Sequence, residues 1–136
     1  MIALVANPLK VVVCAASGRM GTQVAALAAA DPRFTLTAKT VRGTPSGQLV
    51  STLAKADALI DFSTPEASLH FAAAAARVGA AAVIGTTGFS ATQRAKLDTH
   101  AQRTPIFLAP NFSVGVNLLV RLAAQAARAL KDYEAG

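Results

Sequence analysis

Residues 11–24, VVVCAASGRMGTQV, decide the fold, because a β-branched run stops at small residues and a helical pattern follows directly. In βαβ folds such a junction places backbone N–H groups and a helix N-terminus against a dinucleotide pyrophosphate. The spacing G-x-x-G-x-x-G would require glycine at positions 15, 18 and 21 of this chain, but position 15 is Ala15. The stretch therefore predicts a dinucleotide site with an altered first turn. A tight turn without a ligand is the alternative.

The composition describes a single folded domain, residues 1–136. The chain is long enough for a real hydrophobic core, and 53% hydrophobic against 15% charged residues excludes disorder. Arg77 and Gly79 interrupt the richest apolar stretch, residues 71–84, so no segment reaches transmembrane length. The N-terminus lacks the basic start of a signal peptide, and the lone Cys14 excludes an internal disulfide. We expect a cytoplasmic protein in which Cys14 is a small buried strand residue.

The formal net charge of +6 raises the question of a nucleic-acid partner. The basic residues are dispersed, aromatic residues make up only 5%, and the sequence has no basic run and no zinc-ligand spacing. His70 and His100 fall on predicted helices, and we interpret both as surface or packing residues. We therefore expect a small-molecule partner and no nucleic acid, membrane or metal.

Strand and helix patterns alternate along the chain. The alternation of Phe34, Leu36 and Ala38 predicts a half-buried strand, and residues 63–66, STPE, offer a hydroxyl N-cap followed by proline at the first helical position. The predicted strands are 9–15, 34–41, 58–62, 81–84 and 105–109, and the predicted helices are 18–30, 48–55, one opening at 63–66, 90–103 and 113–132. We predict an α/β fold, a Rossmann-type doubly wound parallel sheet with helices on both faces.

The strand exits hold the candidate site, because ligands of such sheets lie along the carboxyl ends of the strands. The second strand ends in KTVRG, residues 39–43, without the carboxylate that would bind a ribose 2′-hydroxyl. Lys39 and Arg42 could instead pair with a 2′-phosphate, which favours NADPH over NADH; a merely solvated loop is the alternative. After the first strand, the helix dipole and free N–H groups predict a pyrophosphate site at Ser17, Gly18, Arg19 and Met20.

The later exits offer aromatic and polar groups. Phe62 is either an apolar wall for a cofactor or a core residue, and Asp61 either orders the adjacent turn or is catalytic. The turn at residues 85–88, GTTG, permits close backbone approach and carries two hydroxyls that suit a ribose or carboxamide; an ordinary glycine turn is the alternative. Asn111 and Ser113 precede the last helix.

Four of these segments, in this order, resemble the cofactor-binding part of the 4-hydroxy-tetrahydrodipicolinate reductases, a family of the diaminopimelate route to lysine. The resemblance runs from about residue 10 to residue 133, nearly the whole chain. It implies an oxidoreductase of amino-acid biosynthesis that uses NADPH or NADH. The matching segments are SGRMG at 17–21, IDFSTPE at 60–66, VIGTTGF at 83–89 and APNFSVGVN at 109–117, of which the last two are the specific ones.

The resemblance also implies roles for these segments. The 17–20 loop would hold the pyrophosphate, residues 62–63 and 85–87 would contact the nicotinamide side, and the 109–112 segment would close over the nicotinamide. Val41 occupies the family's usual carboxylate position, which again favours NADPH, and the Ala15 methyl would lower the affinity. The implied cofactor-binding residues are Ser17, Gly18, Arg19, Met20, Arg42, Phe62, Ser63, Gly85, Thr86, Thr87, Ala109, Asn111 and Phe112.

Three hypotheses for function follow. In the first, the chain is the NAD(P)H-binding domain of such a reductase, and the family's substrate domain, which carries the catalytic histidine and lysine, is absent. We then expect cofactor binding with little or no turnover, and no catalytic residue is assigned. In the second, the chain is a stand-alone dinucleotide-binding or regulatory module. In the third, the apolar final helix lacks a partner and self-associates into a homo-oligomer.

Overall fold

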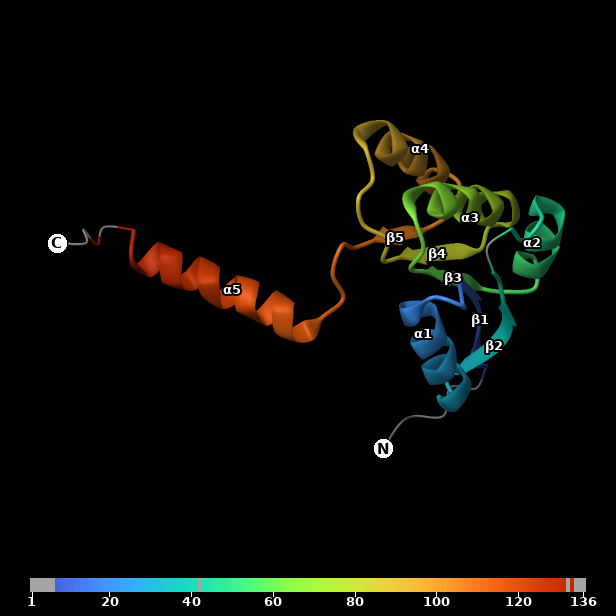
Figure 1. Cartoon of the computed structure of the whole chain (residues 1–136), viewed down its shortest axis with the longest axis horizontal. Coiled ribbons are helices and arrows are strands. Elements are labelled where there is room, and N and C mark those ends of the chain that lie inside the picture. Colours follow the sequence, from blue (N-terminus) through green and yellow to red (C-terminus); the bar gives the residue numbers. More distant parts are fainter. Residues whose placement is uncertain (1–6, 42, 132, 134–136) are drawn as a thin grey trace.

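The computed structural model describes residues 7–41, 43–131 and 133, and within these ranges the strands form one parallel sheet. They lie in the order β2-β1-β3-β4-β5, and every neighbouring pair is parallel. The predicted parallel sheet is therefore confirmed, and all carboxyl ends meet at one edge (Figure 1). The strands are β1 (Leu9–Cys14), β2 (Phe34–Lys39), β3 (Ala58–Asp61), β4 (Ala81–Ile84) and β5 (Ile106–Leu108).

The central strand, β1, is buried because it pairs with β2 on one side and with β3 on the other. Val11, Val12, Val13 and Cys14 are each 1% exposed or less. β-branched side chains suit a strand that is covered on both faces. The edge strand β2 instead alternates half-buried and exposed residues, as its sequence predicted. Cys14 is the small buried strand residue that we expected.

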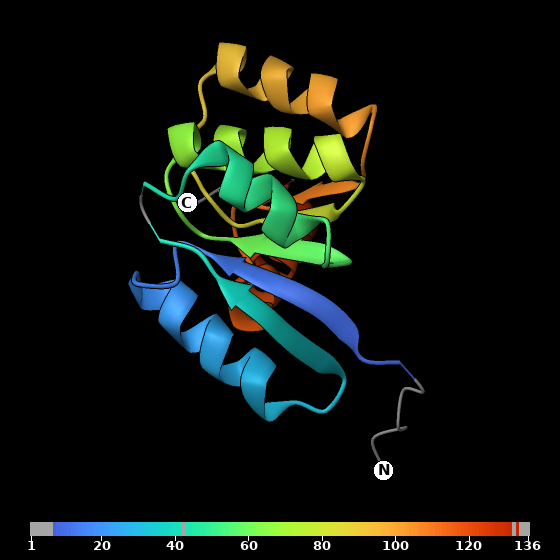
Figure 2. The same cartoon turned by 90° about the vertical axis from the view of Figure 1, so that its right-hand side faces the viewer.

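Helices cover both faces of the sheet (Figures 1 and 2). One face, beside β1 and β2, is covered by α1, and the opposite face by a layer of α2, α3 and α4. The larger apolar core lies under this layer and includes Leu49, Leu53, Leu59, Phe71 and Ile84. The helices are α1 (Arg19–Ala30), α2 (Ser46–Leu53), α3 (Pro65–Val78), α4 (Ala91–Ala101) and α5 (Val114–Ala129).

The last helix covers neither face. In Figure 1, α5 projects away from the body of the molecule, and none of its residues is buried. The prediction of helices on both faces is thus confirmed by α1 to α4, while α5 extends beyond the sheet. Its large apolar side chains, from Val114 to Leu122, are at least 47% exposed.

Helix starts follow the local signals closely. The Thr64 hydroxyl accepts from the Ala67 N–H at 3.5 Å, with proline next in the chain, so the predicted start of α3 is confirmed. Ser90 and Gln93 form a capping box at the start of α4, which supplements the predicted serine cap. The prediction for α2 was wrong by two residues, because the helix begins at Ser46 and Gly47 lies inside it.

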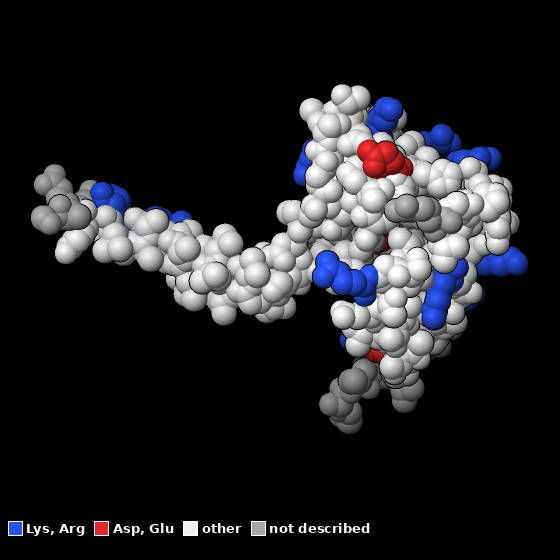
Figure 3. Space-filling model, in the orientation of Figure 1, with Lys and Arg blue, Asp and Glu red and all other residues white. Residues whose placement is uncertain are grey.

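The surface carries scattered charge. On the face shown in Figure 3, Lys and Arg side chains are spread over the body, and α5 is uncharged along most of its length. Within the described residues no helix is long and apolar enough to cross a membrane, and no group of His, Cys, Asp and Glu side chains could hold a metal ion.

Candidate functional site

The turn between β1 and α1 is closed by backbone hydrogen bonds. The Gly18 N–H donates to the Ala15 carbonyl at 3.0 Å, and the Ala16 N–H donates to the Thr40 carbonyl at 3.0 Å, which ties the turn to the end of β2. Ala15 has a φ of 51°, the one positive φ of a non-glycine residue in the described ranges. This left-handed conformation favours glycine, so the alanine at this position is strained.

Gly21 lets α1 begin directly against this turn. A Cβ atom built at Gly21 would overlap the carbonyl oxygen of Ala15 and lie 2.8 Å from the Cα atom of Ala16. A Cβ atom built at Gly18 would lie 3.4 Å from the same carbonyl oxygen, so the crowding there is less severe than at Gly21. Gly21 therefore serves the close helix–strand packing that dinucleotide-binding turns require.

Two helices begin at this edge without a side-chain cap. Their N-cap residues are Gly18 for α1 and Pro45 for α2, and neither offers a side-chain acceptor. In contrast, Thr64, Ser90 and Ser113 cap α3, α4 and α5 through their hydroxyl oxygens. The first N–H groups of α1 and α2 thus remain available to an anion, which the helix dipole also favours.

A pocket of about 640 Å³ lies between these two helix starts. The β1–α1 turn, the loop before α2 and the start of α3 surround it, so it combines an apolar wall with hydroxyl groups. An apolar pocket with a few polar groups, here with the Glu66 carboxyl and the His70 ring in its lining, is typical of small-molecule sites. The residues that line the pocket are Ala15, Ser17, Gly18, Val41, Gly43, Thr44, Pro45, Ser46, Phe62, Ser63, Thr64, Glu66, Ala67, His70 and Phe71.

A smaller hollow of about 340 Å³ adjoins the end of β2 and the start of α2. Lys39, Thr40 and Thr44 line it, and the described lining includes no carboxylate. The Thr44 hydroxyl donates to the Val41 carbonyl at 2.9 Å and so closes the loop. Arg42, the predicted partner of a 2′-phosphate, lies outside the described residues.

The exits of β3, β4 and β5 meet around Phe62. A Cβ atom at Gly85 would overlap the Phe62 ring, so the ring rests directly on the glycine backbone. The Gly85 N–H donates to the Asp61 carbonyl at 2.8 Å. The Phe112 ring meets the Phe62 ring edge to face, with centroids 5.5 Å apart, and Phe107 packs on Phe112 at 5.8 Å. Phe62 is half-buried and lines the pocket, and its role as a wall for a cofactor stays a prediction.

A cluster of hydroxyl groups surrounds the carboxyl of Asp61, which is 0% exposed. The Ser68 hydroxyl donates to Asp61 Oδ2, the Thr86 hydroxyl lies 3.3 Å from the same oxygen, and the Ser68 and Thr86 oxygens are 2.8 Å apart. Burial raises the pKa of Asp61, while hydrogen bonds from Ser68, Ser63 and Thr86 act in the opposite direction. Asp61 thus anchors the neighbouring turn, one of its two predicted roles.

The structure unites some predicted site residues and separates others. Ser17, Gly18, Phe62 and Ser63 line the larger pocket, whereas Thr86 is 4% exposed and turns its hydroxyl inward. The expectation that both hydroxyls of the 85–88 turn face a ligand is therefore wrong for Thr86, and for Thr87, which is exposed, it stays a prediction. The remaining predicted residues lie outside the lining of this pocket: Arg19, Met20, Gly85, Thr87, Ala109, Asn111 and Phe112.

The sequence prediction missed Ser68 and most of the loop before α2. Ser68 precedes Phe71, Ala72 and Ala75 at helical spacing, so its position on the buried face of α3 was the available signal. The loop residues Thr44, Pro45 and Ser46 gave no such signal, because only the fold brings them opposite Phe62 and Ser63.

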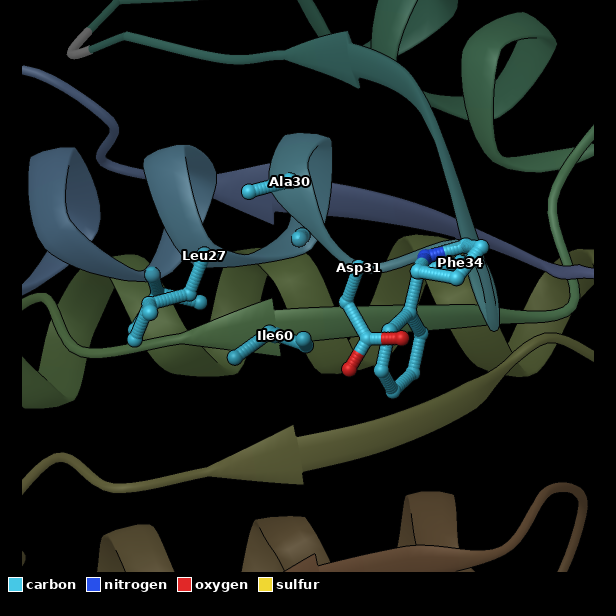
Figure 4. Close-up of a pocket in the computed structure, with 8 residues that line it drawn as sticks. Leu27, Ala30, Asp31, Phe34 and Ile60 are labelled. Atoms are coloured by element: carbon cyan, nitrogen blue, oxygen red, sulfur yellow. The ribbon is translucent and has the colours of Figure 1, made fainter. Parts of the chain in front are cut away.

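A further hollow, of about 500 Å³, lies between α1 and the sheet (Figure 4). Leu27 and Ala30 of α1 line it together with Phe34 and Ile60 of the sheet. Its lining is apolar apart from Asp31, whose carboxylate is already held by Arg33 at 2.6 Å. No convergent polar groups line it, so we assign the candidate site to the strand exits.

The parallel sheet, the glycine turn and the pocket at the carboxyl edge define a Rossmann-type α/β domain. Within that class, the chain belongs to the family described as "Dihydrodipicolinate reductase, N-terminus", whose model matches residues 9–112. This confirms the resemblance seen in the sequence.

Individual relatives agree with this assignment. The chain is 41% identical over 143 residues to a 4-hydroxy-tetrahydrodipicolinate reductase of Anaeromyxobacter dehalogenans, which covers 90% of this chain and 53% of the relative. It is 39% identical over 145 residues to the enzyme of that name from Nitrosomonas europaea. That alignment covers 93% of this chain and 54% of the relative. The chain therefore spans about half the length of these curated relatives.

A solved structure shows the same fold. The dipicolinate-bound dihydrodipicolinate reductase from a Paenisporosarcina species superposes with a TM-score of 0.74 at 20% identity, over 89% of this chain and 54% of that one.

Proposed function

We propose that this chain binds a nicotinamide dinucleotide at the carboxyl edge of its sheet, as the cofactor-binding half of a 4-hydroxy-tetrahydrodipicolinate reductase. The observation that carries the proposal is the pocket of about 640 Å³ between two helix starts without side-chain caps. Two dipoles and two sets of free N–H groups suit a pyrophosphate. Family membership agrees with this reading.

The residues present fit each part of such a cofactor. The backbone at Ser17 and Gly18 would hold the pyrophosphate, and the close approach of α1 to the turn at Gly21 supports this assignment. Phe62 and Ser63 would flank the nicotinamide side, next to the Gly85 backbone. The other residues that the resemblance implies, Arg19, Met20, Thr86, Thr87, Ala109, Asn111 and Phe112, remain proposals.

The end of β2 favours NADPH. Its hollow is lined by Lys39 and by hydroxyl groups, without a carboxylate that would repel a 2′-phosphate. Arg42 follows the described Val41 in the chain and is proposed as a second cationic partner. Binding of NADH remains open to the same site, because the pyrophosphate contacts are shared.

The reaction we propose is hydride transfer to a cyclic imine dicarboxylate. Reduced nicotinamide supplies the hydride when it is bound. This chain's residues bind and orient the cofactor, and none of them is proposed as a general acid. We therefore expect the 136-residue polypeptide to bind the cofactor in the cytoplasm and to reduce substrate poorly or not at all.

Calorimetric titration of the 136-residue chain with NADPH and with NADH tests the proposal. We expect micromolar binding of NADPH and weaker binding of NADH. Lys39→Ala should weaken NADPH binding about fivefold and leave NADH binding unchanged, because only NADPH carries the 2′-phosphate. Lys55→Ala, at an exposed lysine beyond the other end of α2, is the matched control.

Two outcomes would contradict the proposal. If the chain binds neither NADPH nor NADH, the proposed cofactor site is refuted. Steady-state turnover at the level of full-length relatives would refute the expectation that this chain lacks the acid catalyst.

The second candidate, a non-catalytic dinucleotide-binding module, is favoured by the strained Ala15. It predicts that binding persists without turnover even when the chain is joined to the second half of a relative.

A further inference from the structure

A buried polar cluster lies beneath the proposed nicotinamide end of the pocket. It consists of Asp61 at the end of β3, Ser68 on α3 and Thr86 after β4, which are 0%, 0% and 4% exposed. Ser68 donates to Asp61 Oδ2 and lies 2.8 Å from the Thr86 hydroxyl, which itself lies 3.3 Å from that carboxyl oxygen. Asp61 Oδ1 has no hydrogen-bond partner among the described residues. Three segments distant in sequence thus meet at one carboxyl.

None of these three residues lines the pocket, but Asp61 and Ser68 each adjoin a residue that does, and Thr86 adjoins the glycine on which the Phe62 ring rests. Asp61 precedes Phe62, Ser68 follows Ala67, and Thr86 follows Gly85, whose backbone supports the Phe62 ring. The cluster therefore lies directly behind the wall. Because Thr86 directly follows Gly85, the hydrogen bonds of the Thr86 side chain also restrain the backbone on which the Phe62 ring rests.

The cluster is costly, which argues that its geometry matters. A buried carboxyl and two hydroxyl groups lose contact with water, and apolar residues of similar size would fill the same space without that cost. The neighbouring core of Leu59, Ala82 and Ile84 shows that such packing is available in adjacent positions. A polar cluster, unlike an apolar one, fixes the direction of each side chain through its hydrogen bonds.

We propose that Asp61 is a positioning residue which, through Ser68 and Thr86, holds the 85–88 turn against Phe62 and so shapes the nicotinamide end of the pocket. Asp61 and Ser68 act without touching the cofactor. This inference rests on the proposed function, because it assumes that a dinucleotide binds at this edge.

The test compares two probes on the 136-residue chain. NADPH reaches the nicotinamide end, whereas 2′-phospho-ADP-ribose has the same adenosine and pyrophosphate parts and lacks the nicotinamide. Ser68→Ala removes the hydroxyl that joins Asp61 to Thr86. We expect it to weaken NADPH binding about tenfold and to leave 2′-phospho-ADP-ribose binding unchanged, measured by calorimetry.

Thr104→Val is the matched control. Thr104 is also 4% exposed and donates one hydrogen bond, to the Ala80 carbonyl at 2.7 Å, outside the cluster. It should change neither affinity. Urea unfolding of each variant checks that the chain is folded, and Ser68→Cys, which retains a side chain of similar shape with a weaker donor, replaces Ser68→Ala if the alanine variant does not fold.

The outcomes separate the two proposals. If the unmodified chain binds neither probe, the proposed function fails. If it binds both and the Ser68 variants keep the ratio of the two affinities, the positioning role of Asp61 is overturned. Equal weakening of both probes also overturns it, because that result describes a general structural effect.

Discussion

At the scale of single residues, Ala15 shows how one side chain bears on both stability and binding. It is the first residue of the turn that leads into α1, and its φ of 51° places a methyl group in a conformation suited to glycine. The hydrogen bond from the Gly18 N–H to its carbonyl maintains that conformation. The turn is therefore held by its surroundings against the preference of Ala15 itself.

Ala15→Gly should relieve this strain. We expect it to raise the free energy of unfolding by about 1 kcal/mol and to strengthen NADPH binding, because a left-handed alanine costs more than the extra chain entropy of glycine. Ala16→Gly is the control, since Ala16 has no positive φ and the same change there should lower stability by about 0.5 kcal/mol. Urea unfolding measures both effects. Equal destabilisation by the two substitutions would contradict the prediction.

Asp61 should make stability depend on pH in an unusual direction. Burial raises the pKa of Asp61 above its ordinary value of 3.8, against the hydrogen bonds from neighbouring hydroxyl groups. As pH rises above 3.8, the unfolded chain releases this proton before the folded chain does. Stability therefore declines until the pH passes the folded pKa. Burial raises the pKa of Cys14, the neighbouring titratable group on β1, to about 12, so Cys14 stays neutral over this range.

Asp61→Asn removes this dependence. Relative to the unmodified chain, the variant should become progressively more stable as the pH is raised from 3.5 to 7, measured by urea unfolding. For Asp31→Asn, the stability difference from the unmodified chain should change with pH in the opposite direction. Its hydrogen bonds with Arg33 lower the pKa of Asp31 to about 2, so the unmodified chain loses that contribution as pH falls from 3.8 toward 2. A pH-independent stability difference for Asp61→Asn would contradict the raised pKa.

At the scale of elements, the sequence predicted the succession of strands and helices well, because the signals are local. The caps at Thr64 and Ser90 act within one helical turn, and the β-branched run of β1 by itself indicates a strand that is covered on both faces. The error at α2 is also local. Pro45 serves as the N-cap, so the helix accommodates Gly47 at little cost in an exposed first turn.

The candidate site was less predictable than the elements, because it depends on which loops meet. Gly18 and Phe62 could be predicted from their positions after strands. The inward direction of the Thr86 hydroxyl could not, since it depends on Ser68 of α3 and on Asp61 of a different strand. Likewise, the loop before α2 faces the β1–α1 turn only because β2 lies beside β1.

At the scale of the whole molecule, the two sides of the sheet are covered unequally. Among the described residues, three helices cover one face, and α1 is the helix that covers the other, beside β1 and β2 (Figure 2). The groove at Leu27, Phe34 and Ile60 lies where that cover ends (Figure 4). Phe107 of β5 is 59% exposed, and α5, which follows β5, leaves the body instead of packing. Apolar surface therefore remains open on both the sheet and the helix.

This open surface predicts self-association of the 136-residue chain. The side chains of Leu118 and Leu122, one helical turn apart on α5, are 56% and 52% exposed. Contiguous apolar surface of this kind promotes association. Light scattering should show a mass that rises with concentration, and the double substitution Leu118→Gln with Leu122→Gln should return the chain to a monomer. Val120→Gln with Ala124→Gln, on the opposite face of the helix, is the control and should still associate. A concentration-independent monomer of the unmodified chain would contradict the prediction.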